Sequence, residues 1–140
     1  MGNRASGTFE VSVTPHAPEE AGNGNGNGND LMIGRMTIDK RFEGDLTATS
    51  KVQMLSIATK VKNSAGYVAM EWVSGILNGR SGRFALQHSG SMNRGTPTLS
   101  ITVVPDSGTG ELDGISGRMA IEVVGGKHHY VFDYTFAEME

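Results

Sequence analysis

Apolar and polar residues alternate along most of the chain with a period of two. The runs 9–13, 99–103 and 130–136 show the alternation most clearly. This spacing predicts strands with one buried face, and no window carries a long apolar stripe at helical spacing. We therefore expect an all-β protein. Its eight strands are expected near residues 6–14, 32–42, 44–58, 64–77, 82–92, 97–104, 112–124 and 127–136.

The connections between these strands are short and marked by glycine. Asn78-Gly79 and Gly125-Gly126 are hairpin signals, and residues 105–108 (PDSG) form a turn cluster. Eight antiparallel strands joined in this way leave two open edges unless the sheet closes on itself. The pattern predicts an eight-stranded antiparallel up-and-down β-barrel, with a two-sheet sandwich as the alternative.

One segment breaks the pattern. Residues 15–30 (PHAPEEAGNGNGNGND) contain two prolines and three Asn-Gly repeats, with no large apolar residue. Such a composition is typical of a flexible loop or linker. We expect a single β-barrel domain over residues 1–140, with this flexible Asn/Gly-rich insertion between its first two strands.

A short motif occurs twice. Residues 74–84 (SGILNGRSGRF) and 109–119 (TGELDGISGRM) share six of eleven positions at an offset of 35, and residues 44–50 form a weaker third copy. We interpret the motif as a repeated corner in which glycines permit tight turns and close strand crossing. In each copy a single leucine is expected to plug the end of the barrel.

Composition narrows the function classes. The 140 residues carry a net charge of -3, and a pI near 5.8 argues against nucleic acid as the main partner. There is no cysteine, which excludes thiolate metal sites and a cysteine nucleophile. No apolar run approaches the length of a membrane span. We expect a cytoplasmic protein without a cofactor, a nucleic-acid partner or a membrane partner.

Five runs of the chain carry a family resemblance. They are residues 35–46 (RMTIDKRFEGDL), 64–71 (SAGYVAME), 79–90 (GRSGRFALQHSG), 103–112 (VVPDSGTGEL) and 128–134 (HHYVFDY). Together they resemble an uncharacterised bacterial domain family of unknown function, whose fold is similar to the allene oxide cyclase barrel. The resemblance covers about residues 6–136 apart from the insertion. It implies an eight-stranded barrel, often oligomeric, with a small internal cavity, but it does not imply allene oxide cyclisation.

Side-chain parity indicates which residues could carry chemistry. Glu71 and His88 lie within apolar strands, where an inward-facing ionisable group is a plausible acid or base. Gln87 must face away from His88 unless a bulge intervenes. No catalytic residue is assigned. The ligand-binding candidates are Glu71, His88, Gln87, Gln53, Tyr130 and Trp72.

Two further expectations follow from parity. Both faces of strand 64–77 are rather apolar, which favours a cavity on one side and a second copy of the chain on the other, hence a homo-oligomer. His128 and His129 are adjacent on a strand, point apart and cannot chelate one ion, so no metal site is expected.

Three functions remain open. The first is a barrel that binds a small hydrophobic molecule, since eight strands leave room for one small ligand. The second is an isomerase or cyclase acting on a small hydrophobic substrate, and the third is an oligomeric scaffold with a solid core. We favour the first.

Overall fold

The computed structural model describes residues 2–16 and 33–137, and this part of the chain contains strands and turns only. Residues 15 and 16, which we expected in the insertion, belong to the first strand, and residues 17–30 lie outside the described ranges. Within those ranges no helix could cross a membrane. The strands are β1 (Asn3–His16), β2 (Ile33–Gly44), β3 (Leu46–Ala58), β4 (Ala65–Leu77), β5 (Arg80–Asn93), β6 (Thr96–Val103), β7 (Thr109–Gly110), β8 (Ile115–Val124) and β9 (Lys127–Phe136).

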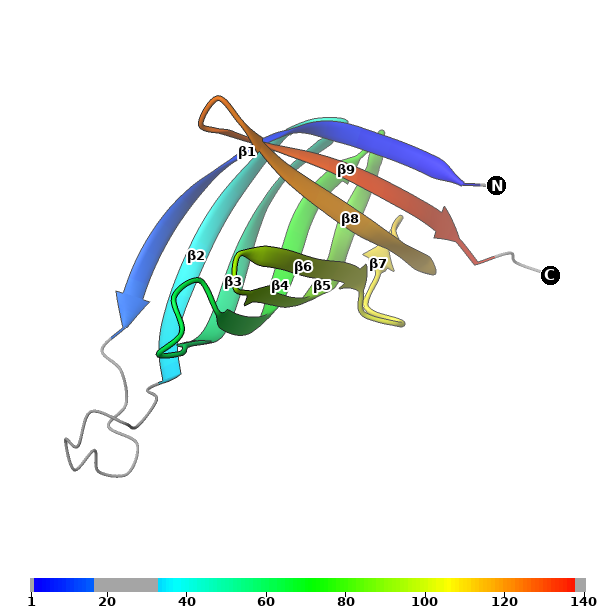
Figure 1. Cartoon of the computed structure of the whole chain (residues 1–140). Helices are drawn as coiled ribbons and strands as arrows, with labels where there is room; N and C mark the ends of the chain where they lie inside the picture. The colour runs from blue at the N-terminus through cyan, green and yellow to red at the C-terminus, as the bar shows by residue number, and fades with distance from the viewer. Residues whose placement is uncertain (1, 17–32, 138–140) are drawn as a thin grey trace.

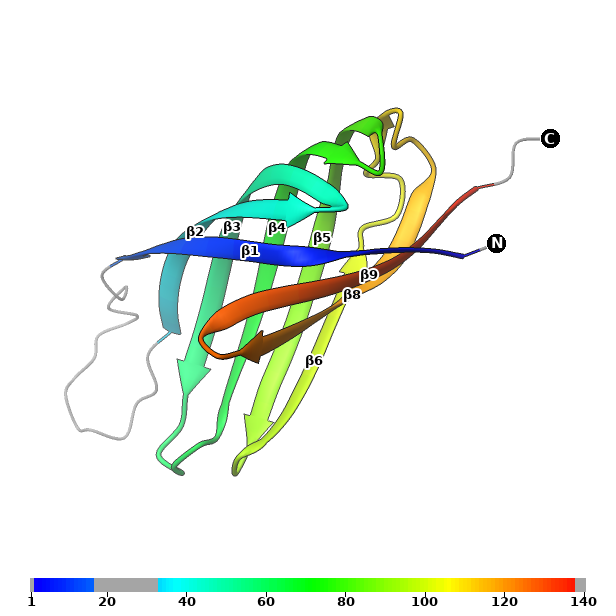
Figure 2. The same ribbon diagram turned by 90° about the horizontal axis from the view of Figure 1, so that it is seen from above.

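Eight of these strands close into a barrel. Each long strand pairs antiparallel with its neighbours in the order β1-β2-β3-β4-β5-β6-β8-β9, and β9 pairs with β1 to complete the circle. Figures 1 and 2 show β8, β9 and the start of β1 crossing obliquely over the wall that β2 to β6 form. The predicted antiparallel barrel is therefore confirmed, and the sandwich alternative is wrong.

One junction in the wall is much weaker than the others. β6 and β8 share a single register pair, Thr102 with Arg118, whereas β1 and β2 share a continuous ladder. Between them the chain turns aside to form β7, which pairs with β5 at Gly82 and Arg83. We did not predict β7, and the strand that we expected to begin at residue 112 begins at Ile115, because residues 111–114 form tight turns.

The end of the barrel near these turns is filled by side chains. Leu46, Leu77 and Leu112, one from each copy of the repeated motif, are fully buried there, which confirms the expected plug. Glycine allows the strands to approach: a Cβ on Gly75 would lie 2.3 Å from the carbonyl oxygen of Thr47. This packed end closes the lumen on one side.

The opposite end of the barrel is open. Val13 is in register with the buried Ile38, and Leu99 shares its face with the buried Ile101, so both side chains face the lumen. They nevertheless remain 48% and 45% exposed, and inward-facing Val123 is 59% exposed. The lumen is thus filled by side chains at one end, and at the other end it is open and lined by apolar side chains.

The outer face of β4 is apolar as well. Val68, Met70 and Trp72 point away from the lumen and are exposed, while Ala69, Glu71 and Val73 between them are buried. Both faces of this strand are therefore apolar, as its sequence indicated. The homo-oligomer that we expected on this basis stays a prediction.

Replacing Tyr130 by Phe tests what holds the turn between β2 and β3. The Tyr130 hydroxyl accepts a hydrogen bond from the Leu46 N–H at 2.9 Å and donates to the Glu43 carbonyl at 2.9 Å. Its loss leaves buried backbone groups unpaired, and we expect the free energy of unfolding in urea to fall by about 1–3 kcal/mol. Tyr67→Phe is the control, because no hydrogen bond engages the Tyr67 hydroxyl within the described residues; an equal loss in both variants would contradict this role.

Candidate functional site

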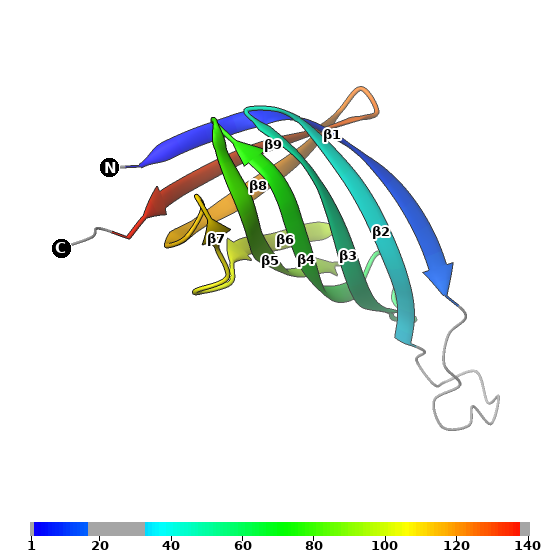
Figure 3. The same ribbon diagram turned by 180° about the vertical axis from the view of Figure 1, so that it is seen from behind.

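Four polar side chains meet inside the barrel. Lys40, Ser50, Glu71 and His88 come from β2, β3, β4 and β5, which lie side by side in Figure 3. All four are buried, and Glu71 is only 1% exposed. Charged groups are almost never buried to this extent without partners. The cluster lies between the packed end and the open end of the lumen.

Glu71 is the centre of this cluster. Its Oε1 accepts hydrogen bonds from His88 Nε2 at 2.7 Å and from Lys40 Nζ at 3.2 Å, and its Oε2 accepts one from Ser50 Oγ at 2.6 Å. The Lys40 ammonium also lies 4.8 Å from the centre of the Phe9 ring, within cation–π range. Both carboxylate oxygens are therefore engaged in a site walled by aromatic rings.

The pKa of Glu71 reflects two opposing effects. Burial disfavours the carboxylate and by itself would raise this pKa. The hydrogen bonds from His88 and Ser50 and the charge of Lys40 outweigh burial, and the net effect lowers the pKa below its ordinary value of 4.5. Glu71 is accordingly an anion at neutral pH, and an ionised carboxylate can only accept hydrogen bonds.

This anion fixes the orientation of the His88 imidazole. Because Glu71 can only accept, the hydrogen bond at 2.7 Å requires the proton to be on His88 Nε2. In the neutral ring Nδ1 then carries a lone pair. Within the described residues Nδ1 has no hydrogen-bond partner, and it is not fully buried, because no fully buried side-chain polar atom lacks a partner. When the ring is neutral, Nδ1 is thus an acceptor held in place by a buried carboxylate.

A hollow lies inside the open end of the barrel. Its volume is about 340 Å³, and its apolar wall includes Met54, Tyr67, Met92 and Leu99. The Tyr67 ring is centred 6.5 Å from the His88 ring, and burial followed by the charge of Glu71 raises the pKa of the Tyr67 phenol. We call this hollow the mouth pocket. Tyr67 is the lining residue that connects it to the polar cluster, through the His88 ring.

The structure separates the sequence-based candidates into three groups. It brings Glu71 and His88 together in the lumen, on the same side of the wall. Gln53, Gln87 and Trp72 point outward, and the opposite orientations of Gln87 and His88 are those that parity predicted. Tyr130 faces the lumen but lies toward the packed end, where its hydroxyl holds the turn between β2 and β3.

Two members of the cluster were missed by sequence reasoning. Lys40 lies between Ile38 and Phe42 on the buried face of β2, so a strict period-two analysis could have identified it as an inward cation. Ser50 carries no such signal.

Among the described residues there is no group of three potential ligands for a metal ion, and His128 stacks on Phe9 with ring centroids 5.0 Å apart.

Replacing Glu71 by Gln should strand the Lys40 ammonium inside the barrel. We expect a loss of about 3–5 kcal/mol in the free energy of unfolding at neutral pH. The double variant Lys40→Met, Glu71→Gln should recover part of that loss, because it removes the unpaired charge. Denaturant titrations of the wild type and both variants measure the effect.

The pH dependence of this difference has a defined sign. A carboxyl with a lowered pKa stabilises the fold above 4.5, its ordinary pKa, and the contribution is lost as the pH falls further through the folded-state value. The stability gap between wild type and Glu71→Gln should therefore shrink below pH 4.5. A gap that stays constant down to the acid unfolding limit would contradict the assignment.

Comparisons with known proteins agree with this architecture. A crystal structure of a protein of unknown function from Shewanella oneidensis is 44% identical, with a TM-score of 0.88, and the match covers 99% of this chain and all of that one. A search of curated proteins gave no match. The expected likeness to allene oxide cyclase stays a prediction. The family model "Protein of unknown function (DUF3224)" matches residues 5–134, and the chain therefore belongs to the DUF3224 family.

Proposed function

We propose that this barrel binds a small, mostly apolar molecule in the mouth pocket and accepts one hydrogen bond from it at His88 Nδ1. The observation that carries the proposal is the apolar wall of this pocket, which includes Tyr67, whose ring is centred 6.5 Å from the ring of the buried His88. Ligand sites of this kind combine an apolar wall with a small number of placed polar groups.

The shape of the lumen supports a ligand of limited size. The packed end closes the bottom of the barrel, so a molecule can enter only from the open end. The hollow of about 340 Å³ lies at the lower limit of typical small-molecule sites. Exposed apolar side chains such as Met92 and Leu99, which line the mouth pocket, would be shielded from water by a bound ligand. The size of the pocket therefore favours a ligand made of one ring, two fused rings or a short chain.

The polar cluster supports the choice of a hydrogen-bond donor. Nδ1 of the neutral imidazole is an acceptor, since Glu71 holds the proton on Nε2. A ligand hydroxyl or amine would satisfy this acceptor, whereas a ligand without a donor would leave it unpaired. Unpaired polar groups in a closed site are costly, and the site should therefore discriminate between the two kinds of molecule.

A pair of nearly isosteric probes tests both parts of the proposal. We expect 2-naphthol, which has one O–H donor, to bind about tenfold more tightly than 2-methylnaphthalene, which has none. Isothermal titration measures both affinities. Leu99→Trp, which fills the mouth, should abolish binding of both probes, and Val68→Trp on the outer face of β4 is the matched control. Equal affinities of wild type and Leu99→Trp for 2-naphthol would overturn the pocket assignment.

The pair of Glu71 and His88 also favours a second candidate function, an isomerase acting on a small hydrophobic substrate. In that reaction Nδ1 would take a proton from a carbon next to a carbonyl group and return it to another position of the same molecule. The Glu71 carboxylate would stabilise the imidazolium that forms, as a positioning residue. The proton is conserved, so no co-reactant is required.

Exchange of deuterium from heavy water into 2-tetralone, an enolisable bicyclic ketone, tests this candidate. If His88 is the base, the wild type should accelerate exchange at the carbon next to the carbonyl, and His88→Gln should reduce the rate at least about a hundredfold. Gln87→Ala, the outward neighbour, is the control and should retain the rate. Mass spectrometry follows the exchange, and a wild-type rate equal to the buffer rate would reject the isomerase for ketones of this size.

A further inference from the structure

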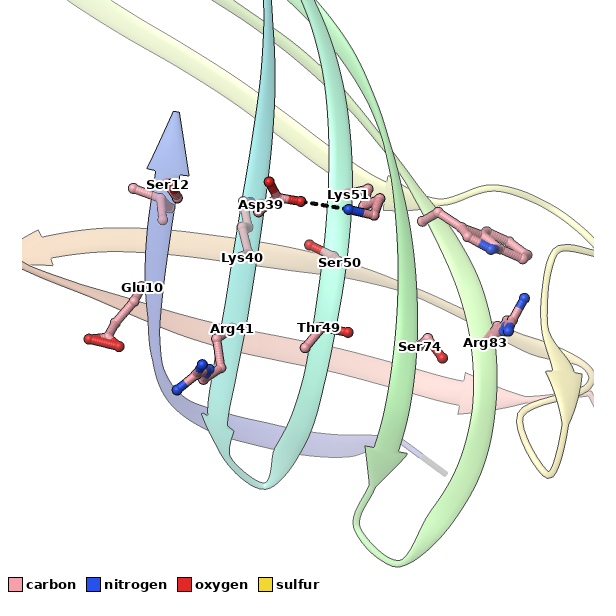
Figure 4. A pocket seen from close by; sticks show the side chains of 12 residues that line it. Glu10, Ser12, Asp39, Lys40, Arg41, Thr49, Ser50, Lys51, Ser74 and Arg83 are labelled. Atoms are coloured by element: carbon pink, nitrogen blue, oxygen red, sulfur yellow. Dashed lines mark hydrogen bonds and ion pairs between the residues drawn. The ribbon is translucent and has the colours of Figure 1, made fainter. Parts of the chain in front are cut away.

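A second concave site lies on the outside of the barrel, across β1 to β5. It is a groove of about 590 Å³, separated from the mouth pocket by the barrel wall. Figure 4 shows Arg41 on one side of it and Arg83 on the other, with the short side chains of Thr49 and Ser74 between them. We call this site the outer groove.

The register of the sheet places these four residues in one row. Arg41 pairs with Thr49, Thr49 with Ser74, and Ser74 with Arg83, so all four project from the same outer face. Neighbouring strands lie about 4.8 Å apart, which separates the two arginine Cα atoms by about 14 Å. Long arginine side chains on either side of two hydroxyl groups can reach a ligand held above those hydroxyls.

Some charged side chains around the groove form ion pairs, and others do not. Asp39 and Lys51 pair with each other at 2.9 Å, and the ammonium of Lys40 is turned inward to Glu71. Within the described residues no hydrogen bond or ion pair engages the guanidinium of Arg41 or Arg83. Glu10 is the cross-strand neighbour of Arg41 but forms no ion pair with it within 4.0 Å. Two cations are therefore available for a ligand.

An aromatic surface lies next to this row. Trp72 lines the groove, is 43% exposed, and precedes Ser74 by two positions on the same face of β4. Residues two positions apart along a strand are separated by about 7 Å. A planar ring against Trp72 could therefore belong to the same ligand as a charged group above Ser74.

We propose that the outer groove binds a phosphate monoester that carries an aromatic ring. Arg41 and Arg83 donate hydrogen bonds to the phosphate oxygens, the hydroxyls of Thr49 and Ser74 donate from the floor, and the ring stacks on Trp72. Guanidinium groups match phosphate geometry better than ammonium groups do, because they donate two parallel hydrogen bonds. This site is independent of the small-molecule function proposed for the lumen.

The chain contains a built-in reporter for this site, since Trp72 is its only tryptophan. We expect adenosine monophosphate to quench the Trp72 fluorescence in a saturable way at constant ionic strength, with adenosine at least about tenfold weaker. Arg41→Gln and Arg83→Gln should each raise the dissociation constant by about tenfold or more. Arg118→Gln, an exposed arginine on β8, is the matched control and should bind as the wild type does.

Three results would overturn the proposal. They are no saturable quenching at millimolar nucleotide, equal affinity for adenosine, and equal losses in Arg118→Gln and the groove variants. Leu99→Arg, which alters the mouth pocket, should leave nucleotide binding unchanged. A variant that loses 2-naphthol but keeps the nucleotide separates a failure of the lumen proposal from a failure of this one.

Discussion

The carboxylate of Glu71 is a negative charge held inside a β-barrel, and the interior is arranged around it. Three hydrogen bonds tie it to Lys40, Ser50 and His88, so that one side chain on β4 connects β2, β3 and β5. Burial of such an ion is tolerated only with near-complete hydrogen bonding. The same bonds lower its pKa and set the tautomer of His88, and the structural role and the proposed chemical role of this carboxylate are therefore inseparable.

The two ends of the barrel interior have different roles: one is packed and stabilises the fold, and the other is open to solvent. One end is filled by leucines from three copies of one corner motif and by a group of aromatic rings. There the rings of Phe84 and Phe132 are stacked with their centroids 5.5 Å apart. The other end keeps apolar side chains in contact with solvent. Because the packed half already supplies the core, the open half is free to carry a pocket. The polar cluster marks the boundary between them.

Much of this architecture could be read from the sequence. Period-two alternation located all eight long strands to within a few residues, and glycine spacing located the leucine plug. The polar cluster was only half predicted: Glu71 and His88 stood out within apolar runs, whereas the inward parity of Lys40 was overlooked and Ser50 looks like an ordinary surface residue. Their meeting depends on strand register, which brings together residues from four strands. The outer groove was missed for the same reason, since its row of residues exists only once the sheet is assembled.

The junction between β6 and β8 is the place where the barrel wall can open most easily. The other junctions of the ring carry between seven and thirteen register pairs, whereas this one carries a single pair. Thermal breathing of the wall concentrates where the fewest backbone hydrogen bonds must break. The barrel is therefore held firmly from β2 to β5, and it can widen by separation of β6 from β8.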